Sequence, residues 1–410
     1  MKKHLVLLAA ASLALACSTP SSRIPQNLAG TWSGEIEGLG LSLTLHLSDT
    51  LCTVDSPDQG AFGLRAEVRR ASEGAVQVKF PDFHAGLKAT LQGDSLVGTF
   101  SQLVIRKKIA MGRGLLVRNR PQTPVPPFPY GTEEIGIPRG DFSLAGTLTL
   151  PEGDREAPVV VMVSGSGQQD RDETLMDHKP FAVLADALAR AGIPSLRYDD
   201  RGCGGSGGVF AEATTADFAG DAAAAVRFLR DRGFTKVGIL GHSEGGTIAF
   251  LLAGAETREE GTPDFIVSLA GMADRGDSTL LRQTARMLSL QGAPEKVADF
   301  AAKKMYKKVL KQKSAWMEYF VTLDPAPAVS RITCPVLALN GSLDSQVIPE
   351  WNLDKVKVLC PSADCRLYPG LNHLFQHCGT GLSDEYAKIE ETISEEVIAD
   401  IVSWIRRIPD

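Results

Sequence analysis

The sequence has little excess charge, few aromatic side chains and no metal-binding pattern of cysteines, and each shortage excludes a class of function. A net charge of -6 provides no basic surface for binding nucleic acid. Aromatic residues make up only 6% of the chain, which gives no evident stacking platform for carbohydrates. The seven cysteines match no common zinc spacing, so we assign no metal and no cofactor.

The apolar stretch at the N-terminus is too short to cross a bilayer. Lys2 and Lys3 precede apolar residues 5–16, which is typical of a signal peptide. The small residues before Cys17 and the serine after it resemble a bacterial lipoprotein lipobox. We therefore expect a signal peptide over 1–16, lipidation of Cys17 and a tether over 17–28. The protein is then exported and faces the outer membrane or periplasm, and simple secretion is the alternative.

Export places the other cysteines in a compartment where disulfides can form. Cys360 and Cys365 flank a short turn. A short-loop disulfide between them and two unpaired buried thiols are both compatible with this spacing.

Two domains are expected from the length of 410 residues. Residues 29–118 alternate apolar and polar side chains, as in Leu41–Leu47 and Ala75–Phe80, and this period of two predicts antiparallel strands. We expect a small all-β domain, a barrel or a sandwich. The proline-rich residues 119–130 are interpreted as a stiff linker.

The pattern changes over residues 131–410, where apolar strand signals alternate with helix signals. This alternation predicts an α/β domain with a mostly parallel sheet covered on both faces. Strands are expected at 144–150, 159–163, 193–198, 236–240, 265–269 and 336–339, and helices at 181–190, 216–232, 246–255 and 397–408. Helical, lysine-rich sequence at about 272–330 interrupts the alternation and is interpreted as a cap.

The pentapeptide Gly241-His242-Ser243-Glu244-Gly245 follows an apolar strand signal and precedes a buried helix signal. A strand that ends in G-x-S-x-G and enters a helix must turn sharply, and the glycines leave room for neighbouring backbone. The turn holds its serine exposed in a strained conformation. Ser243 is therefore the predicted nucleophile, and a plain glycine turn is the alternative.

A serine hydroxyl needs a base to take its proton. In chains with such a G-x-S-x-G turn, the expected order along the sequence is nucleophile, acid and then histidine. Only His373 and His377 lie beyond Ser243. His373 follows a strand signal and a Pro-Gly turn, so we predict it as the base and give His377 a structural or secondary role.

The base needs a carboxylate to fix its tautomer. Asp344 follows a buried strand signal and turns toward the expected carboxyl edge of the sheet, where active sites are built. Asp324 precedes that strand and Asp354 lies in the next helix, so both fit capping or surface roles better. Asp344 is the predicted acid.

An oxyanion intermediate needs two hydrogen-bond donors. The backbone N–H of Glu244, directly after the nucleophile, is the expected first donor. The glycine-rich segment 164–168 follows a strand signal and offers the second, with Ser166 as our choice and Gly165 as its neighbouring alternative. A glycine turn without any ligand role is the other interpretation.

The segment Asp199–Ser206 also follows a strand signal, but it lacks the lysine and the glycine order of a phosphate loop. We reject nucleotide binding and favour an Arg-Asp pair that braces loops near the site. If Cys203 were the nucleophile, Ser243, Asp344 and His373 would have no catalytic role, so we reject this alternative.

With these motifs in order, residues 131–410 resemble the α/β hydrolase superfamily, especially bacterial esterases grouped with the serine aminopeptidase-like hydrolases. Exported members with an extra N-terminal β domain look similar over the whole mature chain, including the segment 55–60. An aliphatic residue often stands in such proteins where this chain has Cys203. The matching segments are Ser164–Asp172, Tyr198–Gly202, Gly241–Gly246, Asn340–Asp344 and Asn372–His373.

The resemblance implies hydrolysis of carboxylic esters through an acyl-serine, with Ser243, Asp344 and His373 as the triad and no cofactor. Because no obvious lipid-binding patch is present, we expect a small-molecule, short-chain acyl ester as substrate. An aminopeptidase or thioesterase with the same triad is the alternative. A non-catalytic surface binding module is a different class, and the complete triad argues against it.

Overall fold

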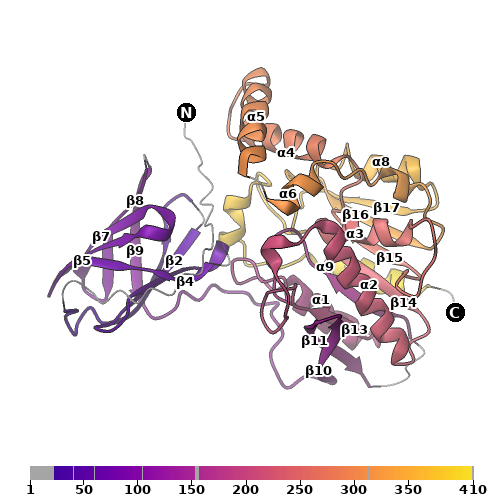
Figure 1. The fold of residues 1–410 in the computed structure, drawn as a ribbon, viewed down its shortest axis with the longest axis horizontal. Helices are drawn as coiled ribbons and strands as arrows, with labels where there is room; N and C mark the ends of the chain where they lie inside the picture. Colours follow the sequence, from indigo (N-terminus) through magenta and orange to yellow (C-terminus); the bar gives the residue numbers. More distant parts are fainter. Residues whose placement is uncertain are drawn as a thin grey trace. The chain divides into compact units, whose positions relative to one another are not determined.

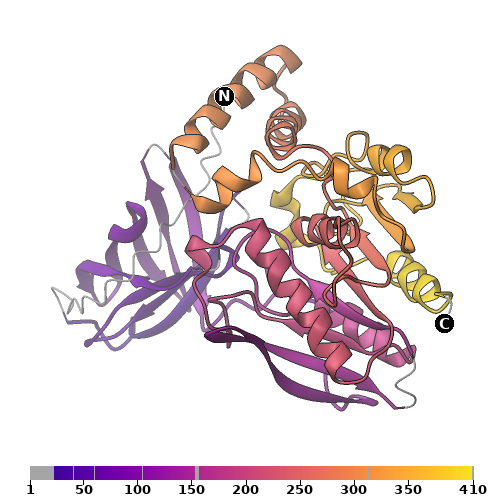
Figure 2. The same cartoon turned by 45° about the vertical axis from the view of Figure 1, so that its right-hand side comes forward.

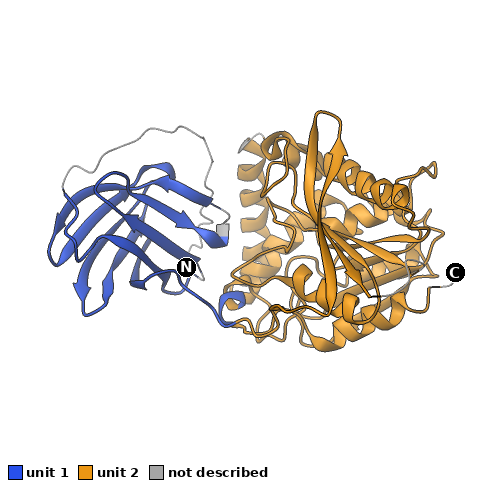
Figure 3. Ribbon diagram, turned by 90° about the horizontal axis from the view of Figure 1, so that it is seen from below, with its two compact units in different colours: residues 1–119, 386–388 blue, residues 120–385, 389–410 orange. Residues whose placement is uncertain are grey.

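A computed structural model describes residues 23–408 except 40, 60, 104, 153–156 and 313. The predicted signal peptide and Cys17 therefore lie outside the described residues. The chain divides into two compact units, residues 1–119 with 386–388 and residues 120–385 with 389–410 (Figure 3). Across the described ranges, no helix has the length and apolarity that a membrane crossing requires.

The first unit is one antiparallel sheet of nine strands in the order β4-β3-β2-β1-β9-β8-β7-β6-β5. The all-β prediction for the N-terminal region is confirmed. The strands are β1 (Gly30–Ile36), β2 (Leu41–Leu47), β3 (Thr53–Ser56), β4 (Ala61–Arg65), β5 (Glu67–Ser72), β6 (Ala75–Phe80), β7 (Ala85–Gln92), β8 (Ser95–Gln102) and β9 (Ile105–Arg113).

The sheet of the first unit encloses one apolar core. In β6, Val76 and Val78 are buried while the intervening Gln77 is exposed, as the period of two requires. Val54 near one edge of the sheet and Val68 at the other belong to the same buried cluster. The sheet must therefore curve so that its two ends share a core.

The second unit contains a mixed sheet of eight strands in the order β10-β11-β13-β12-β14-β15-β16-β17 (Figure 1). The β10–β11 and β11–β13 pairs are antiparallel, and the remaining pairs are parallel. The strands are β10 (Tyr130–Arg139), β11 (Phe142–Pro151), β12 (Val159–Val163), β13 (Ser195–Tyr198), β14 (Val237–His242), β15 (Ile266–Leu269), β16 (Val336–Gly341) and β17 (Asp364–Tyr368).

Helices cover both faces of this sheet, which confirms the predicted α/β architecture. One buried cluster joins the sheet to α1 (Pro180–Arg190) and α9 (Glu395–Ile405). A second cluster joins it to α2 (Thr215–Asp231), α3 (Glu244–Ala253) and α8 (Leu353–Leu359). The parallel strands are buried on both sides, so β12 is a continuous run of buried valine and methionine.

Helices also fill the interval between β15 and β16, where we expected a cap. They are α4 (Gly276–Leu290), α5 (Glu295–Val309), α6 (Ala315–Phe320) and α7 (Ala326–Val329). The first two contact each other and extend from the body of the second unit (Figure 2). The short 3-10 helices of the described chain are Pro57–Gln59, Pro81–Phe83, Phe210–Glu212, Leu310–Gln312 and Ser383–Lys388.

The segment that we interpreted as a linker is hydrogen-bonded to the second unit. Arg120 Nη1 donates to the carbonyl of Ile389 at 2.8 Å, and Gln122 Nε2 donates to the carbonyl of Ile393 at 2.8 Å. These contacts hold the start of the segment against the unit that it enters.

Candidate active site

Ser243 occupies a tight turn between β14 and α3. Its backbone has φ of 53° and ψ of -113°, a strained conformation for a side chain other than glycine. A Cβ on Gly241 would lie 2.1 Å from the carbonyl oxygen of Gly245, and one on Gly245 would lie 2.0 Å from that of Val163. Both glycines are therefore required for this turn, and the serine stands at the carboxyl end of a central strand.

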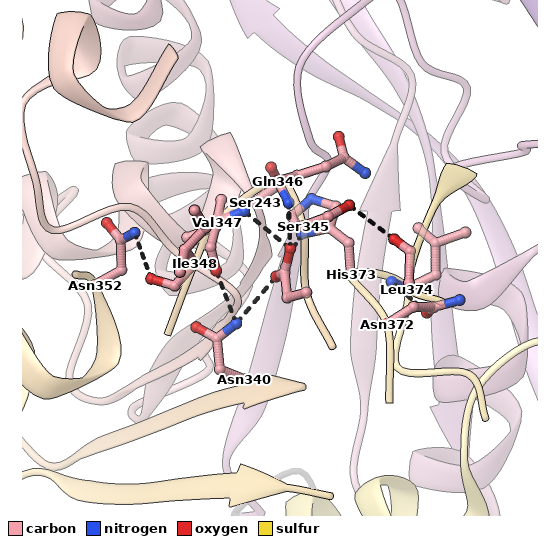
Figure 4. Close-up of polar contacts among 12 residues, drawn as sticks. Ser243, Asn340, Ser345, Gln346, Val347, Ile348, Asn352, Asn372, His373 and Leu374 are labelled. Carbon is pink, nitrogen blue, oxygen red and sulfur yellow. Dashed lines mark hydrogen bonds and ion pairs between the residues drawn. The ribbon is translucent and has the colours of Figure 1, made fainter. Parts of the chain in front are cut away.

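His373 and Asp344 meet at the same edge of the sheet, after β17 and β16. His373 Nδ1 lies 2.8 Å from Asp344 Oδ2, and both side chains are buried. The backbone N–H groups of Gln346 and Val347 donate to Asp344 Oδ1 at 2.8 and 2.9 Å, and Asn340 Nδ2 donates to Oδ2 at 3.0 Å (Figure 4). These donors fix the carboxylate so that it accepts Nδ1–H of His373 and leaves Nε2 as the base.

Ser243 and His373 line one cavity of about 310 Å³. Within the described residues, no hydrogen bond joins the Ser243 hydroxyl to the His373 ring. Such contacts are often long in a free enzyme and tighten when substrate is bound. Ser243 and His373 therefore share one cavity, and Asp344 is hydrogen-bonded to His373 without lining that cavity.

The N-terminus of α3 and the loop after β12 border the nucleophile. Glu244 is the first residue of α3, where backbone N–H groups have no partner within the helix and carry partial positive charge. A Cβ on Gly165 would lie 3.3 Å from the Cβ of Ser243, which places the loop beside the nucleophile. The Gly165 N–H already donates to Glu173 Oε1 at 2.7 Å, so Ser166 keeps the role of second predicted donor.

The side chain of Glu244 is buried and joins three segments. Its Oε1 accepts hydrogen bonds from Thr215 Oγ1 at 2.6 Å and from Trp316 Nε1 at 2.8 Å. Ser166 also donates to this carboxylate, and burial raises the pKa of Glu244. Sequence reasoning assigned a role only to the backbone of Glu244, because the motif does not reveal the environment of its side chain.

Ion pairs brace the loops around the site. Arg171 pairs with Asp199 at 2.9 Å, and Arg201 pairs with Asp221 at 2.7 Å. Arg201 lies in the segment Asp199–Ser206, for which we expected an Arg-Asp pair that braces loops. Arg171 lies in Ser164–Asp172, one of the segments that match the α/β hydrolases.

Burial raises the pKa values of two side chains near the site, Asp200 and Cys203. Asp200 accepts hydrogen bonds from Ser164 Oγ and from the N–H of Gln169, both at 2.9 Å, and burial raises its pKa to about 8. Burial also raises the pKa of the Cys203 thiol to about 11, because it disfavours the thiolate. Cys203 is therefore poorly suited to act as a nucleophile.

His377, Cys360 and Cys365 lie outside the catalytic arrangement. The side chain of His377 is exposed and pairs with Glu391 at 2.9 Å. Cys360 and Cys365 are free thiols, and no potential metal-binding cluster of three His, Cys, Asp or Glu residues occurs in the described part of the chain.

Sequence reasoning missed a second buried pair beside the predicted triad. Glu173 Oε1 lies 2.8 Å from His242 Nδ1, and His242 Nε2 lies 3.0 Å from the carbonyl oxygen of His373. The two members of the pair are 69 positions apart, and no local pattern connects them.

The fold and the site together define a class. A central strand leads through a strained serine turn into a helix, and a His-carboxylate pair follows on later strand ends of the same mixed sheet. The second unit therefore has the α/β hydrolase fold.

Comparisons with known proteins agree with this class. The family model described as serine aminopeptidase, S33, matches residues 176–377. The chain is 30% identical over 282 residues to esterase EstD of Thermotoga maritima, an alignment that covers 64% of this chain and 65% of the relative. The chain thus spans less than two thirds of that relative's length.

Solved structures of low sequence identity also match. The Pyrococcus furiosus esterase Pf2001 is 18% identical, with a TM-score of 0.45 over 72% of this chain and 99% of that one. Est1E from Butyrivibrio proteoclasticus is 16% identical, with a TM-score of 0.43 over 67% of this chain and 98% of that one.

Proposed function

We propose that this protein is a serine esterase that cleaves small acyl esters through an acyl-serine intermediate. The observation that carries the proposal is the 2.8 Å contact of buried Asp344 with His373, which lines the same cavity as Ser243 at its strained turn. The similarity to an esterase of Thermotoga maritima supports the same reaction.

Each step of the reaction can be assigned to a group in the cavity. His373 Nε2 takes the proton of the Ser243 hydroxyl as Oγ attacks the ester carbonyl. The N–H groups of Glu244 and Ser166 stabilise the oxyanion, and the imidazolium then protonates the departing alcohol. Water, deprotonated by the same imidazole, attacks the acyl-serine; the acyl–Oγ bond then breaks, the imidazolium returns the proton to Ser243 Oγ, and the carboxylic acid is released.

The size and lining of the cavity support short acyl chains. At about 310 Å³ it lies at the small end of the range for ligand pockets. Met272, Leu280, Trp316 and Phe320 give it an apolar wall on the side of the cap. A short acyl group fits such a wall better than a long lipid chain does.

An aminopeptidase is the second candidate, because the matching family model carries that description. A thioesterase would use the same groups. An aminopeptidase and a thioesterase differ from the proposed esterase in the leaving group of the substrate. Assays with p-nitrophenyl esters of two to six carbons, acyl thioesters and aminoacyl anilides therefore distinguish the three activities. Higher kcat/KM on the anilides would replace the esterase proposal.

The triad assignment predicts a large loss of activity on substitution. Ser243→Ala or His373→Ala should lower kcat for p-nitrophenyl butyrate by about a million-fold, and Asp344→Ala somewhat less, because the three groups act as a unit. A fluorophosphonate probe should label the wild type and leave Ser243→Ala unlabelled. Retained turnover in folded Ser243→Ala would exclude Ser243 as the nucleophile.

A further inference from the structure

Glu173 links two parts of the catalytic arrangement through one oxygen atom. Its Oε1 accepts the backbone N–H of Gly165 at 2.7 Å and lies 2.8 Å from His242 Nδ1. His242 in turn contacts the carbonyl oxygen of His373 through Nε2 at 3.0 Å. One carboxylate thus connects the loop after β12 to the backbone of the catalytic histidine.

The partners of His242 determine where its protons lie. A carbonyl oxygen only accepts, so Nε2 carries a proton that it donates to His373. A carboxylate oxygen also accepts, so a second proton lies between Nδ1 and Glu173. Burial alone would lower the pKa of His242, but Glu173, the carbonyl of His373 and Asp344 together outweigh burial and the pKa is raised. The contacts therefore describe a pair that shares a proton, and the raised pKa of His242 favours the form in which the imidazolium holds it.

The charged pair lies directly against the catalytic ring. The ring centroids of His242 and His373 are 4.8 Å apart, and the planes are inclined by 46°. The titratable groups that face His242 are Glu173 from the loop before α1, His373 after β17 and Asp344 after β16. A lone cation at this place would oppose the imidazolium that His373 becomes during catalysis, and the Glu173 charge offsets it.

The conformation of Glu173 shows that its position is imposed by the surrounding structure. Its φ of 54° lies in the left-handed region, which is unfavourable for a residue other than glycine. The residue is 4% exposed, and its Oε2 makes no hydrogen bond within the described chain. A buried carboxylate that carries these costs needs compensating contacts, and those present are Gly165 and His242.

We propose that Glu173, acting through His242, is a positioning residue that aligns the catalytic histidine and the oxyanion loop and balances the charge beside His373. The inference rests on the proposed ester hydrolysis. The proposal contains two separate effects. The hydrogen bonds of Glu173 fix the positions of the loop after β12 and of His242, and the charges of the Glu173–His242 pair determine how readily His373 gains a proton.

The test compares purified full-length variants with p-nitrophenyl butyrate between about pH 5 and 9, the range in which histidines titrate. Glu173→Gln keeps the shape and removes the charge. His242→Gln removes the cation and leaves Glu173 unneutralised. Asp172→Asn is the matched control, since Asp172 neighbours Glu173 but pairs with Arg197 and Lys179.

In Glu173→Gln, kcat should fall about 10- to 100-fold while KM changes less than about threefold, as for other residues that orient catalytic groups. In His242→Gln, the acid limb of kcat/KM should move to higher pH, because His373 is protonated more readily without a neighbouring cation. Asp172→Asn should match the wild type in both measurements.

Two results would overturn the inference, and both are distinct from a failure of the proposed function. One is wild-type kcat in folded Glu173→Gln, and the other is an unmoved acid limb in folded His242→Gln, with folding checked by circular dichroism. If only one variant folds, its readout decides. A wild-type protein that hydrolyses no ester refutes the proposed function before any variant is compared.

Discussion

At the scale of single residues, three buried acids hold the loop that follows β12. Asp200 accepts from Ser164 and Gln169, Glu173 accepts from Gly165, and Glu244 accepts from Ser166. Burial raises the pKa values of Asp200 and Glu244. Repulsion by the Glu244 and Glu173 carboxylates raises the pKa of Asp200 further. Two of the three acids that hold the loop, Asp200 and Glu244, therefore keep a proton to higher pH than free carboxyl groups do.

The ionisation of Asp200 predicts a pH-dependent stability. Its pKa is about 8 in the folded protein against 3.8 for the free side chain, so the folded state holds a proton that the unfolded state has lost. The resulting stability is fully present below about pH 4 and is lost as the pH rises to about 8, by up to about 1.4 kcal/mol per pH unit.

Asp200→Asn removes this ionisation. Thermal unfolding should therefore show a larger loss of Tm for the wild type than for the variant between about pH 5.5 and 8, the range in which the linkage acts. Equal losses in the two proteins would mean that Asp200 titrates outside this window.

At the scale of elements, α6 of the cap is tied to α3 through one hydrogen bond between side chains. Trp316 in α6 donates to Glu244, the residue that follows the nucleophile, and stacks on Phe320 with ring centroids 4.7 Å apart. Trp316 and Glu244 both line the cavity. Cap position and the start of α3 are therefore coupled.

Trp316→Phe keeps an aromatic ring and removes the donor. Losing one hydrogen bond to a buried carboxyl group costs about 1–3 kcal/mol, and we expect kcat/KM to fall roughly tenfold. Trp351→Phe is the control, because Trp351 is half exposed and its ring stacks on the Arg282 guanidinium at 3.7 Å. An unchanged kcat/KM in Trp316→Phe, equal to that of the control, would show that the bond has no part in catalysis.

Elements with a strong local pattern were predictable from the sequence. The run Val159–Val163 is β12 to the residue, since a central parallel strand is apolar throughout. Helix α2 begins at Thr215, one residue before our predicted start, behind a capping box formed by Thr214 and Asp217. We did not predict β10, whose glycines and Pro138 weaken a strand pattern, although it pairs with β11 along its whole length.

The site was predictable only where chain order constrains it. The G-x-S-x-G motif and the scarcity of histidines after it point to Ser243 and His373, which line one cavity. The Glu173–His242 pair was not predictable, because it depends on a loop conformation with positive φ and on a contact across 69 positions. The buried environment of the Glu244 side chain likewise arises only from tertiary packing.

At the scale of the whole molecule, the chain combines a β unit, a hydrolase unit and an N-terminal segment with a lipoprotein pattern. We propose that Cys17 is acylated and anchors the enzyme to the outer membrane. A lipoprotein carries several acyl chains, and stable anchoring needs more than the single chain that binds only marginally.

Cys17→Ser should then release active enzyme into the soluble fraction, while the wild type sediments with membranes. Fractionation with an esterase assay measures the first effect, and mass spectrometry of the N-terminal peptide detects the lipid. Fully soluble periplasmic wild type without lipid mass would identify residues 1–16 as an ordinary signal peptide.

The packing of glycines around Ser243 limits where this enzyme can be diversified by directed evolution. Any Cβ at Gly241, Gly245 or Gly246 would meet backbone or side-chain atoms at 2.0–2.7 Å, so a saturation library at these codons is expected to return almost entirely the parental residue. Leu280 and Gln283 line the cavity from α4. Substrate range is therefore open to selection from the cap side, while the backbone that presents the nucleophile is closed to it.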